Sequence, residues 1–194
     1  FNITPFYPEG GGQIGDTGVI ENSSENIAIV NTKKENKLIV HFTDELPNDV
    51  KSSFTAKVNV LDRKASARNH TATHLLHESL RSILGNHVEQ KGSLVNPKYL
   101  RFDFTHFAKI GKADLQKIEQ DVNAKILANI ALNEHINLSL KQAEDMGAIM
   151  LFGEKYEDVV RMIQFDSSKE LCGGTHVAAT GEIGLFKILS EGST

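Results

Sequence analysis

The stretch that decides the fold is DRKASARNHTATHLLHESLRSILG, residues 62–85. Asp62 is of a type that commonly caps the start of a helix, and Gly85 of a type that commonly follows the end, so the stretch predicts a helix of about six turns. Apolar side chains recur at helical spacing on one of its faces: Leu76, Leu80, Ile83 and Leu84. We therefore expect residues 62–194 to fold around this helix as an α+β unit.

Two histidines of this helix, His70 and His74, project from the same side. They lie about 40° apart around the helix axis and beside the apolar face, so both rings point inward. About a hundred residues further on, the segment CGGTH brings the only cysteine, Cys172, together with His176. Two imidazoles from a helix, with a thiolate and an imidazole from a distant turn, make a sensible tetrahedral set for zinc.

Two alternatives stay open on the residues alone. Inward histidine pairs are often core residues with satisfied hydrogen bonds rather than metal ligands. His77 lies about 20° from His70 on the other side, so helical geometry does not exclude it as a rival ligand. The segment argues against a zinc protease, because Thr71 stands where the HExxH motif needs its general-base glutamate.

The chain before residue 62 is predicted to be β. Short β-branched or apolar runs lie between turns, at residues 18–20, 27–30, 37–42 and 54–60. The polar residues 33–36 predict the turn of a hairpin between two of these runs. Short strands so closely spaced favour a small β-barrel, so residues 1–61 form the first expected domain.

The second expected domain, residues 62–194, mixes helices and strands. A second amphipathic helix is predicted over residues 112–132, and a shorter one after Ser139, which can form a capping box with Gln142. Strand-like runs occupy residues 100–104, 159–165 and 183–189. The expected architecture is a long helix packed on an antiparallel or mixed sheet.

A glycine-rich segment, GGGQIG at residues 10–15, matches the G-x-G-x-x-G pattern of dinucleotide-binding loops. No apolar strand precedes it and no helix is predicted directly after it, so the structural context of that motif is missing. We interpret the segment as a turn or a core contact of the barrel.

Composition and charge narrow the classes of function. The 194 residues carry a formal net charge of −4 and are 40% hydrophobic and 24% charged, which is ordinary for a globular protein. No apolar run is long enough to span a membrane, and a single cysteine fits a reducing compartment such as the cytoplasm.

Residues 51–117 hold twelve Lys and Arg against five Asp and Glu. This basic middle favours an anionic partner, with an unevenly charged solvated surface as the alternative.

Five sequence blocks occur in an order that points to one family. They are PFYPEGGGQIGD (5–16), RNHTATHLLH (68–77), QKGSLV (90–95), LRFDF (100–104) and CGGTHV (172–177). The series resembles the editing domain of alanyl-tRNA synthetases and, less closely, their free-standing editing relatives. The resemblance implies a β-barrel with the glycine-rich loop, followed by an α/β editing core. It also implies that zinc is held by His70, His74, Cys172 and His176, and not by His77.

The activity implied by the resemblance is hydrolysis of the ester that joins serine or glycine wrongly to tRNA(Ala). An activation pocket sized for a methyl group rejects glycine poorly and an added hydroxyl only modestly, so a second, hydrolytic site is needed. The resemblance puts Thr73, Gln90 and Ser93 at this site. The alternatives are a solvated turn around Gln90 and a Thr73 hydroxyl bonded to its own helix backbone.

The basic middle of the chain suits a polyanionic substrate. Within it we expect Arg68, Lys91 and Arg101 to contact tRNA phosphates. Four protein ligands predict a zinc ion that organises the site or positions the substrate, because a catalytic zinc usually keeps an open position.

The resemblance also sets expectations about context. We expect a domain of a longer synthetase, whose other domains bind ATP and alanine, with tRNA(Ala) as partner and neither membrane nor DNA. Two other functions compete. One is a free-standing trans-editing deacylase with the same chemistry, and the other is a non-catalytic, zinc-stabilised tRNA-binding module.

Overall fold

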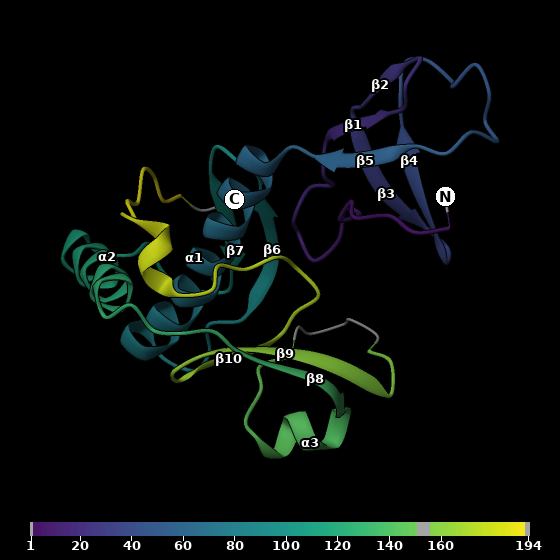
Figure 1. Cartoon of the computed structure of the whole chain (residues 1–194). Helices are drawn as coiled ribbons and strands as arrows, with labels where there is room; N and C mark the ends of the chain where they lie inside the picture. The colour runs from purple at the N-terminus through teal and green to yellow at the C-terminus, as the bar shows by residue number, and fades with distance from the viewer. Residues whose placement is uncertain (1, 151–155, 193–194) are drawn as a thin grey trace.

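The computed structural model describes residues 2–150 and 156–192, and it confirms the expected α+β class. Figure 1 shows a group of N-terminal strands beside a larger unit built around the helix α1 (Val60–Leu84). Neighbouring strands in every sheet run antiparallel. No helix in the described part of the chain combines the length and apolar character needed to cross a membrane.

The N-terminal unit contains two small sheets. One has the strand order β2 (Asn26–Ile29), β1 (Gly18–Glu21), β5 (Thr55–Val58), and the other pairs β3 (Asn31–Glu35) with β4 (Leu38–Phe42). Its buried apolar side chains are Phe6, Ile20, Ile27 and Ile29. Among the described residues β5 pairs only with β1 and β4 only with β3, so the strands do not close on one another. The expected β-barrel is not confirmed.

The hairpin of this unit differs from the sequence prediction. Lys33 and Lys34 belong to β3, and the turn lies at Asn36, whose φ is 56°. Thr32 is the only buried residue of β3. Because its other side chains are polar, this strand has no apolar alternation by which the sequence could reveal it.

The larger unit packs around α1. The helix begins earlier than predicted because Asn59, and not Asp62, caps it: the Asn59 side chain accepts a hydrogen bond from the Asp62 N–H. Helix α2 (Lys112–Leu127) lies against α1, as does the hairpin of β6 (Gln90–Val95) and β7 (Leu100–Phe104).

A three-stranded sheet completes this unit. Its strand order is β10 (Ser168–Leu171), β9 (Val159–Phe165), β8 (Asn133–Ser139). Figure 1 shows the sheet running beneath α1, with the short helix α3 (Leu140–Asp145) on its far side. A 3-10 helix, η1 (Thr180–Ile183), contacts both α1 and α2.

Parts of the prediction for this unit are confirmed. Strands lie at residues 100–104 and 159–165, and the capping box of Ser139 and Gln142 starts α3. The second helix, however, ends at Leu127 because Asn129 turns the chain with a φ of 49°.

The strand predicted at residues 183–189 is wrong. The segment begins in the last residue of η1 and continues without regular structure. Its apolar side chains, Phe186 and Ile188, pack against the main core instead of pairing with a sheet. Strands β6, β8 and β10 were not predicted, because polar residues and glycine make up most of each strand.

The glycine-rich segment joins the two units. Val95 of β6 donates its N–H to the Gly12 carbonyl at 2.8 Å, and Ile14 donates to the Val95 carbonyl at 3.1 Å. Arg63 of α1 adds an ion pair with the buried Asp16 of the N-terminal unit. The loop is therefore fixed to the hairpin and the helix.

We expect Gly12→Ala to destabilise the protein more than Gly11→Ala. Both variants place an alanine at positive φ, +77° and +57°, at a cost of about 1–2 kcal/mol. Only at Gly12 would the new methyl group also lie 2.8 Å from the Ser93 carbonyl oxygen, whereas Gly11 has nothing within 4 Å. Urea unfolding measures the free energy of unfolding of both variants. Equal losses of stability would contradict a glycine-rich segment that is packed against Ser93 at Gly12.

Candidate metal centre

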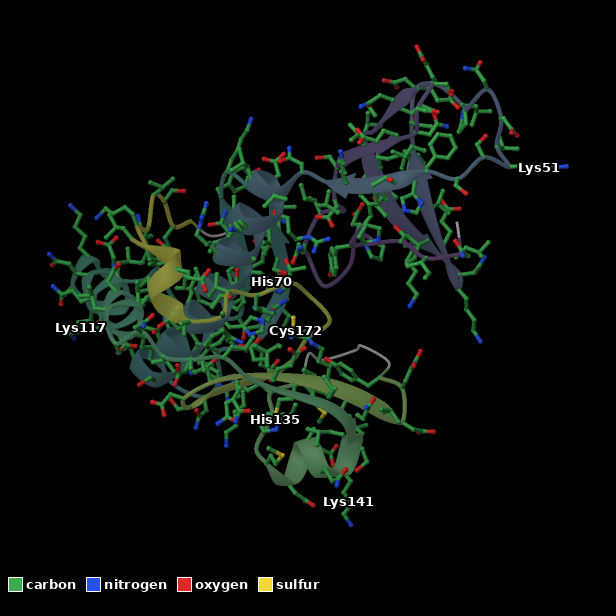
Figure 2. All side chains as sticks on the ribbon, in the orientation of Figure 1. Lys51, His70, Lys117, His135, Lys141 and Cys172 are labelled. Carbon is green, nitrogen blue, oxygen red and sulfur yellow. The ribbon has the colours of Figure 1, made fainter. Side chains whose placement is uncertain are left out.

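Four ligand-type side chains meet on the buried side of α1. His70 and His74 come from the helix, and Cys172 and His176 from the turn after β10. One ligand atom of each lies within 4.8 Å of all the others. Figure 2 shows His70 and Cys172 adjacent at the centre of the molecule. The two halves of the predicted motif thus lie together in space.

The distances suit a small tetrahedral ion. Sγ of Cys172 lies 3.4 Å from Nε2 of His70 and 3.3 Å from Nε2 of His176. With zinc bonds of about 2.0–2.1 Å to nitrogen and about 2.3 Å to sulfur, a tetrahedral N···S edge is about 3.5 Å. These two edges match a zinc tetrahedron, and the remaining ligand atoms, which lie within 4.8 Å of one another, would close in around such an ion.

Two of the imidazoles have their second nitrogen held by a polar neighbour. Nδ1 of His70 lies 2.8 Å from the side-chain oxygen of Gln13, which keeps the proton on Nδ1 and leaves Nε2 for a metal. Nδ1 of His176 lies 3.1 Å from the Thr71 hydroxyl. Such partners fix both the orientation and the tautomer of a metal-binding histidine.

The third imidazole, His74, lies against a buried carboxylate that sequence reasoning missed. Oε2 of Glu170 on β10 is 3.7 Å from Nε2 of His74, and Oε1 is 3.0 Å from Nδ1 of His77. Within the described residues, Nδ1 of His74 is buried with no hydrogen-bond partner. A metal ion would satisfy this nitrogen, so the donor set fits zinc. His77 is bonded to Glu170 and lies outside the four-residue group.

The surroundings favour the metal-binding forms of Cys172 and His176 but the protonated form of His74. Burial alone would raise the pKa of the Cys172 thiol, but the imidazoles of His70 and His74 hold that pKa well below its usual value. Burial lowers the pKa of His176 to about 3, so this ring is neutral. Burial also lowers the pKa of His74, but the carboxylate of Glu170 and the thiolate of Cys172 outweigh it and raise the pKa to about 9. Metal binding would therefore displace a proton from His74.

Gln13 connects the N-terminal unit to this group. Its buried amide accepts a hydrogen bond from the Thr175 N–H at 3.0 Å and donates one to the Thr175 hydroxyl at 2.9 Å. The same turn passes so close to His70 that a methyl group at Gly174 would overlap the ring. The glycine-rich segment is thus more than the turn or core contact that its sequence predicts. The one sequence signal for this further role is an amide side chain inside a tight glycine turn.

A cavity of about 420 Å³ opens beside the metal group. Among its lining residues are the three predicted site residues Thr73, Gln90 and Ser93. Gln90 and Ser93 lie in β6 and not in a turn, and the Gln90 amide donates to the Ser93 hydroxyl at 3.3 Å. The Thr73 hydroxyl donates its proton to the Asn69 carbonyl at 2.9 Å, as the backbone alternative expects, and its oxygen keeps acceptor capacity at the cavity wall.

The three predicted phosphate contacts do not line this cavity. Arg101 forms an ion pair with Asp103 at 3.0 Å, and Lys91 forms one with Glu89 at 3.0 Å. Arg68 is exposed on α1.

Two other cations do line the cavity, Lys34 and Arg161. Arg161 donates to the backbone carbonyls of Cys172 and Gly174, at 2.9 and 2.8 Å, and so holds the ligand-bearing turn. Lys34 has no acidic partner in the described part of the chain. Sequence reasoning missed Lys34 because it assigned residues 33–36 to a turn.

Comparison with known proteins agrees with this arrangement. Residues 160–194 match the family described as "Threonyl and Alanyl tRNA synthetase second additional domain", and residues 1–64 the family described as "tRNA synthetases class II (A)". The chain is 58% identical to the alanine–tRNA ligase of Bacteroides fragilis over 99% of its length. It is 56% identical to that of Flavobacterium psychrophilum over 98%.

The chain resembles the editing region of alanyl-tRNA synthetases. It spans about a fifth of these alanyl-tRNA synthetase relatives, 22% of each protein. The family resemblance stated from the sequence blocks is thereby confirmed.

We expect Gln13→Leu to lower the affinity for zinc by about 10- to 100-fold, because leucine removes the acceptor that orients His70. Competition with a chromophoric chelator measures the affinity, and circular dichroism checks that the variant is folded. The matched control is Gln116→Leu at an exposed position of α2, and Cys172→Ala is the reference for a lost site. An unchanged affinity for zinc in Gln13→Leu would contradict the role of Gln13 in orienting His70.

Proposed function

We propose that the chain is an aminoacyl-tRNA deacylase that hydrolyses the ester of serine or glycine on tRNA(Ala). The cavity is the observation that carries this proposal, because Thr73, Gln90 and Ser93 line it together with His70, His74 and Cys172. Its volume of about 420 Å³ suits a small acyl group. The relatives named alanine–tRNA ligase support tRNA(Ala) as the carrier.

We propose zinc as the resident metal, held by His70, His74, Cys172 and His176. Three imidazoles and one thiolate are typical zinc donors, and the orphaned nitrogen of His74 supports a bound ion. With four protein ligands, the ion would supply a fixed positive charge and a rigid wall for the cavity. Orientation of the substrate then falls to the protein side chains.

Thr73 supplies the discrimination in this proposal. Its proton is bonded to the Asn69 carbonyl, so its oxygen acts as an acceptor toward the hydroxyl of a serine ester. The methyl group of alanine offers no proton and would bury that oxygen without a partner, at a cost of about 1–3 kcal/mol. In the glycine ester a water molecule would take the place of the serine hydroxyl.

The phosphates of the tRNA would lie near the cations of the cavity. Lys34 is the first candidate, since it lines the cavity and has no acidic partner in the described ranges. Arg68, Lys91 and Arg101 are proposed as secondary contacts, because Lys91 and Arg101 would have to leave their present ion pairs.

The main rival function is a non-catalytic, zinc-stabilised tRNA-binding module. Such a module needs the metal and the cations but no cavity at the metal group. A free-standing deacylase shares the chemistry proposed here, and either form would act in the cytoplasm, where tRNA is charged.

Deacylation of tRNA(Ala) carrying labelled serine tests the proposal. We expect the chain to release serine much faster than it releases alanine from correctly charged tRNA(Ala). We expect Thr73→Val to lower this serine-over-alanine ratio by about tenfold, because valine keeps the shape of threonine and loses the acceptor.

The controls separate this effect from loss of the site. Zinc content must be the same in both proteins, and Thr55→Val, at an exposed position of β5, should leave the ratio unchanged. No hydrolysis by the zinc-loaded wild-type chain would favour the binding module. An unchanged ratio in Thr73→Val would contradict the role of the Thr73 hydroxyl and would leave the deacylase proposal standing.

Phosphate contacts should appear in the salt dependence of tRNA binding. A variant that removes one phosphate contact should flatten the slope of log affinity against log salt concentration by about one unit at most. We expect this for Lys34→Ala, and a smaller change for Arg68→Ala. Lys141→Ala on α3, which Figure 2 shows far from the metal group, is the matched control. A wild-type slope near zero would rule out electrostatic docking.

A further inference from the structure

Three aromatic rings, those of His87, His106 and Phe107, lie outside the cavity at the open end of the β6–β7 hairpin. The rings of His87 and Phe107 are 4.6 Å apart between centroids and inclined by 24°, and those of His87 and His106 are 5.2 Å apart and inclined by 20°. Nε2 of His87 lies 2.9 Å from Nδ1 of His106, so these two rings meet edge to edge and Phe107 alone stacks on the face of His87. The rings of His106 and Phe107 are tilted by 39°. Phe107 is 87% exposed, so the ring that stacks on His87 is open to solvent.

Hydrogen bonds hold the backbone beside these rings. The Thr105 hydroxyl donates to the His87 carbonyl at 2.8 Å and accepts from the Glu89 N–H at 3.0 Å. Arg81 of α1 donates to the carbonyls of Asn86 and Val88, at 3.1 and 2.8 Å. The backbone on which His87 is carried is therefore fixed by hydrogen bonds, and His87 offers Phe107 a positioned ring to stack on.

These rings lie within reach of the cavity. Strand β6 begins at Gln90, a residue of the cavity wall, three positions after His87. On α1, Arg81 lies eight residues beyond Thr73, which is about 12 Å along the helix axis. This distance corresponds to about three or four stacked nucleotides of a single strand.

The charges around Phe107 favour an anionic ligand. Lys109 and Lys112 are exposed and have no acidic partner in the described ranges. Of the nearby acidic groups, Glu89 is paired with Lys91, and Glu191 accepts from the Ile110 N–H at 3.5 Å. Open aromatic faces beside unpaired cations are the features that bind unpaired nucleotides.

We propose that Phe107 is a stacking platform for an unpaired base in the single-stranded 3′ end of the tRNA, upstream of the esterified nucleotide. This inference rests on the proposed function, because it needs the 3′ end to enter the cavity. The platform would hold the strand on its way to the cavity, with Lys109 and Lys112 close to the neighbouring phosphates. It would therefore contribute to binding and not to the hydrolytic step.

The test uses RNA stem-loops with a single-stranded 3′ end in which successive bases are replaced by fluorescent 2-aminopurine. We expect one position to be quenched on binding. Phe107→Ala and Phe107→Leu should abolish that quenching and weaken binding by about tenfold, whereas Phe107→Tyr should retain both. A stem-loop without the single-stranded end should bind wild type and variants equally. Leu127→Ala, another exposed apolar position, is the control for general effects.

Deacylation kinetics distinguish the two proposals. For Phe107→Ala we expect a higher KM for seryl-tRNA(Ala) with an unchanged kcat. Equal RNA affinity and equal quenching in wild type and Phe107→Ala overturn the platform and leave the deacylase intact. Failure of the wild-type chain to hydrolyse seryl-tRNA(Ala) overturns the proposed function itself, whatever Phe107 does.

Discussion

The site depends on one contact, in which the turn at residues 172–176 packs against the buried side of α1. The contact brings a thiolate and three imidazoles within 4.8 Å of one another in a largely buried place, where unpaired polar groups are costly. Gly174 permits it, because any side chain there would overlap His70. The apolar core between α1 and α2 supports the helix from its other side, so ordinary hydrophobic packing keeps the polar group in place.

The two units of the chain meet at this same contact. Gln13 of the N-terminal unit holds both the His70 ring and Thr175 of the turn, and Gly12 binds the end of β6. Lys34 and Gly11 line the cavity from the N-terminal side. The N-terminal unit is thus part of the site, and a displacement of its glycine-rich loop would disturb the orientation of a ligand ring.

The long helix and its pair of histidines were predictable because helical spacing is a local signal. Helical spacing left the choice between His74 and His77 open, and only the resemblance to editing domains favoured His74. The structural reason is Glu170, a residue 93 positions from His77 on a strand with little apolar alternation. The roles of Gln13 and Lys34 were not predictable either, because neither residue leaves a local pattern in the sequence. Gln13 acts through a contact 57 residues away, and Lys34 sits on a polar strand that looks like a turn. Phe107 carries no signal in the sequence, since its significance lies in its exposure and in its stacking on His87.

The central claim is that three imidazoles and one thiolate, each oriented by its surroundings, hold a single zinc ion. X-ray absorption at the zinc edge measures the ligands directly on the zinc-loaded chain. We predict one equivalent of zinc with one sulfur neighbour at about 2.3 Å and three nitrogen neighbours at about 2.0–2.1 Å. A spectrum without sulfur, or with six light-atom neighbours, would contradict the account, because the ion would then lie outside the contact between α1 and the turn.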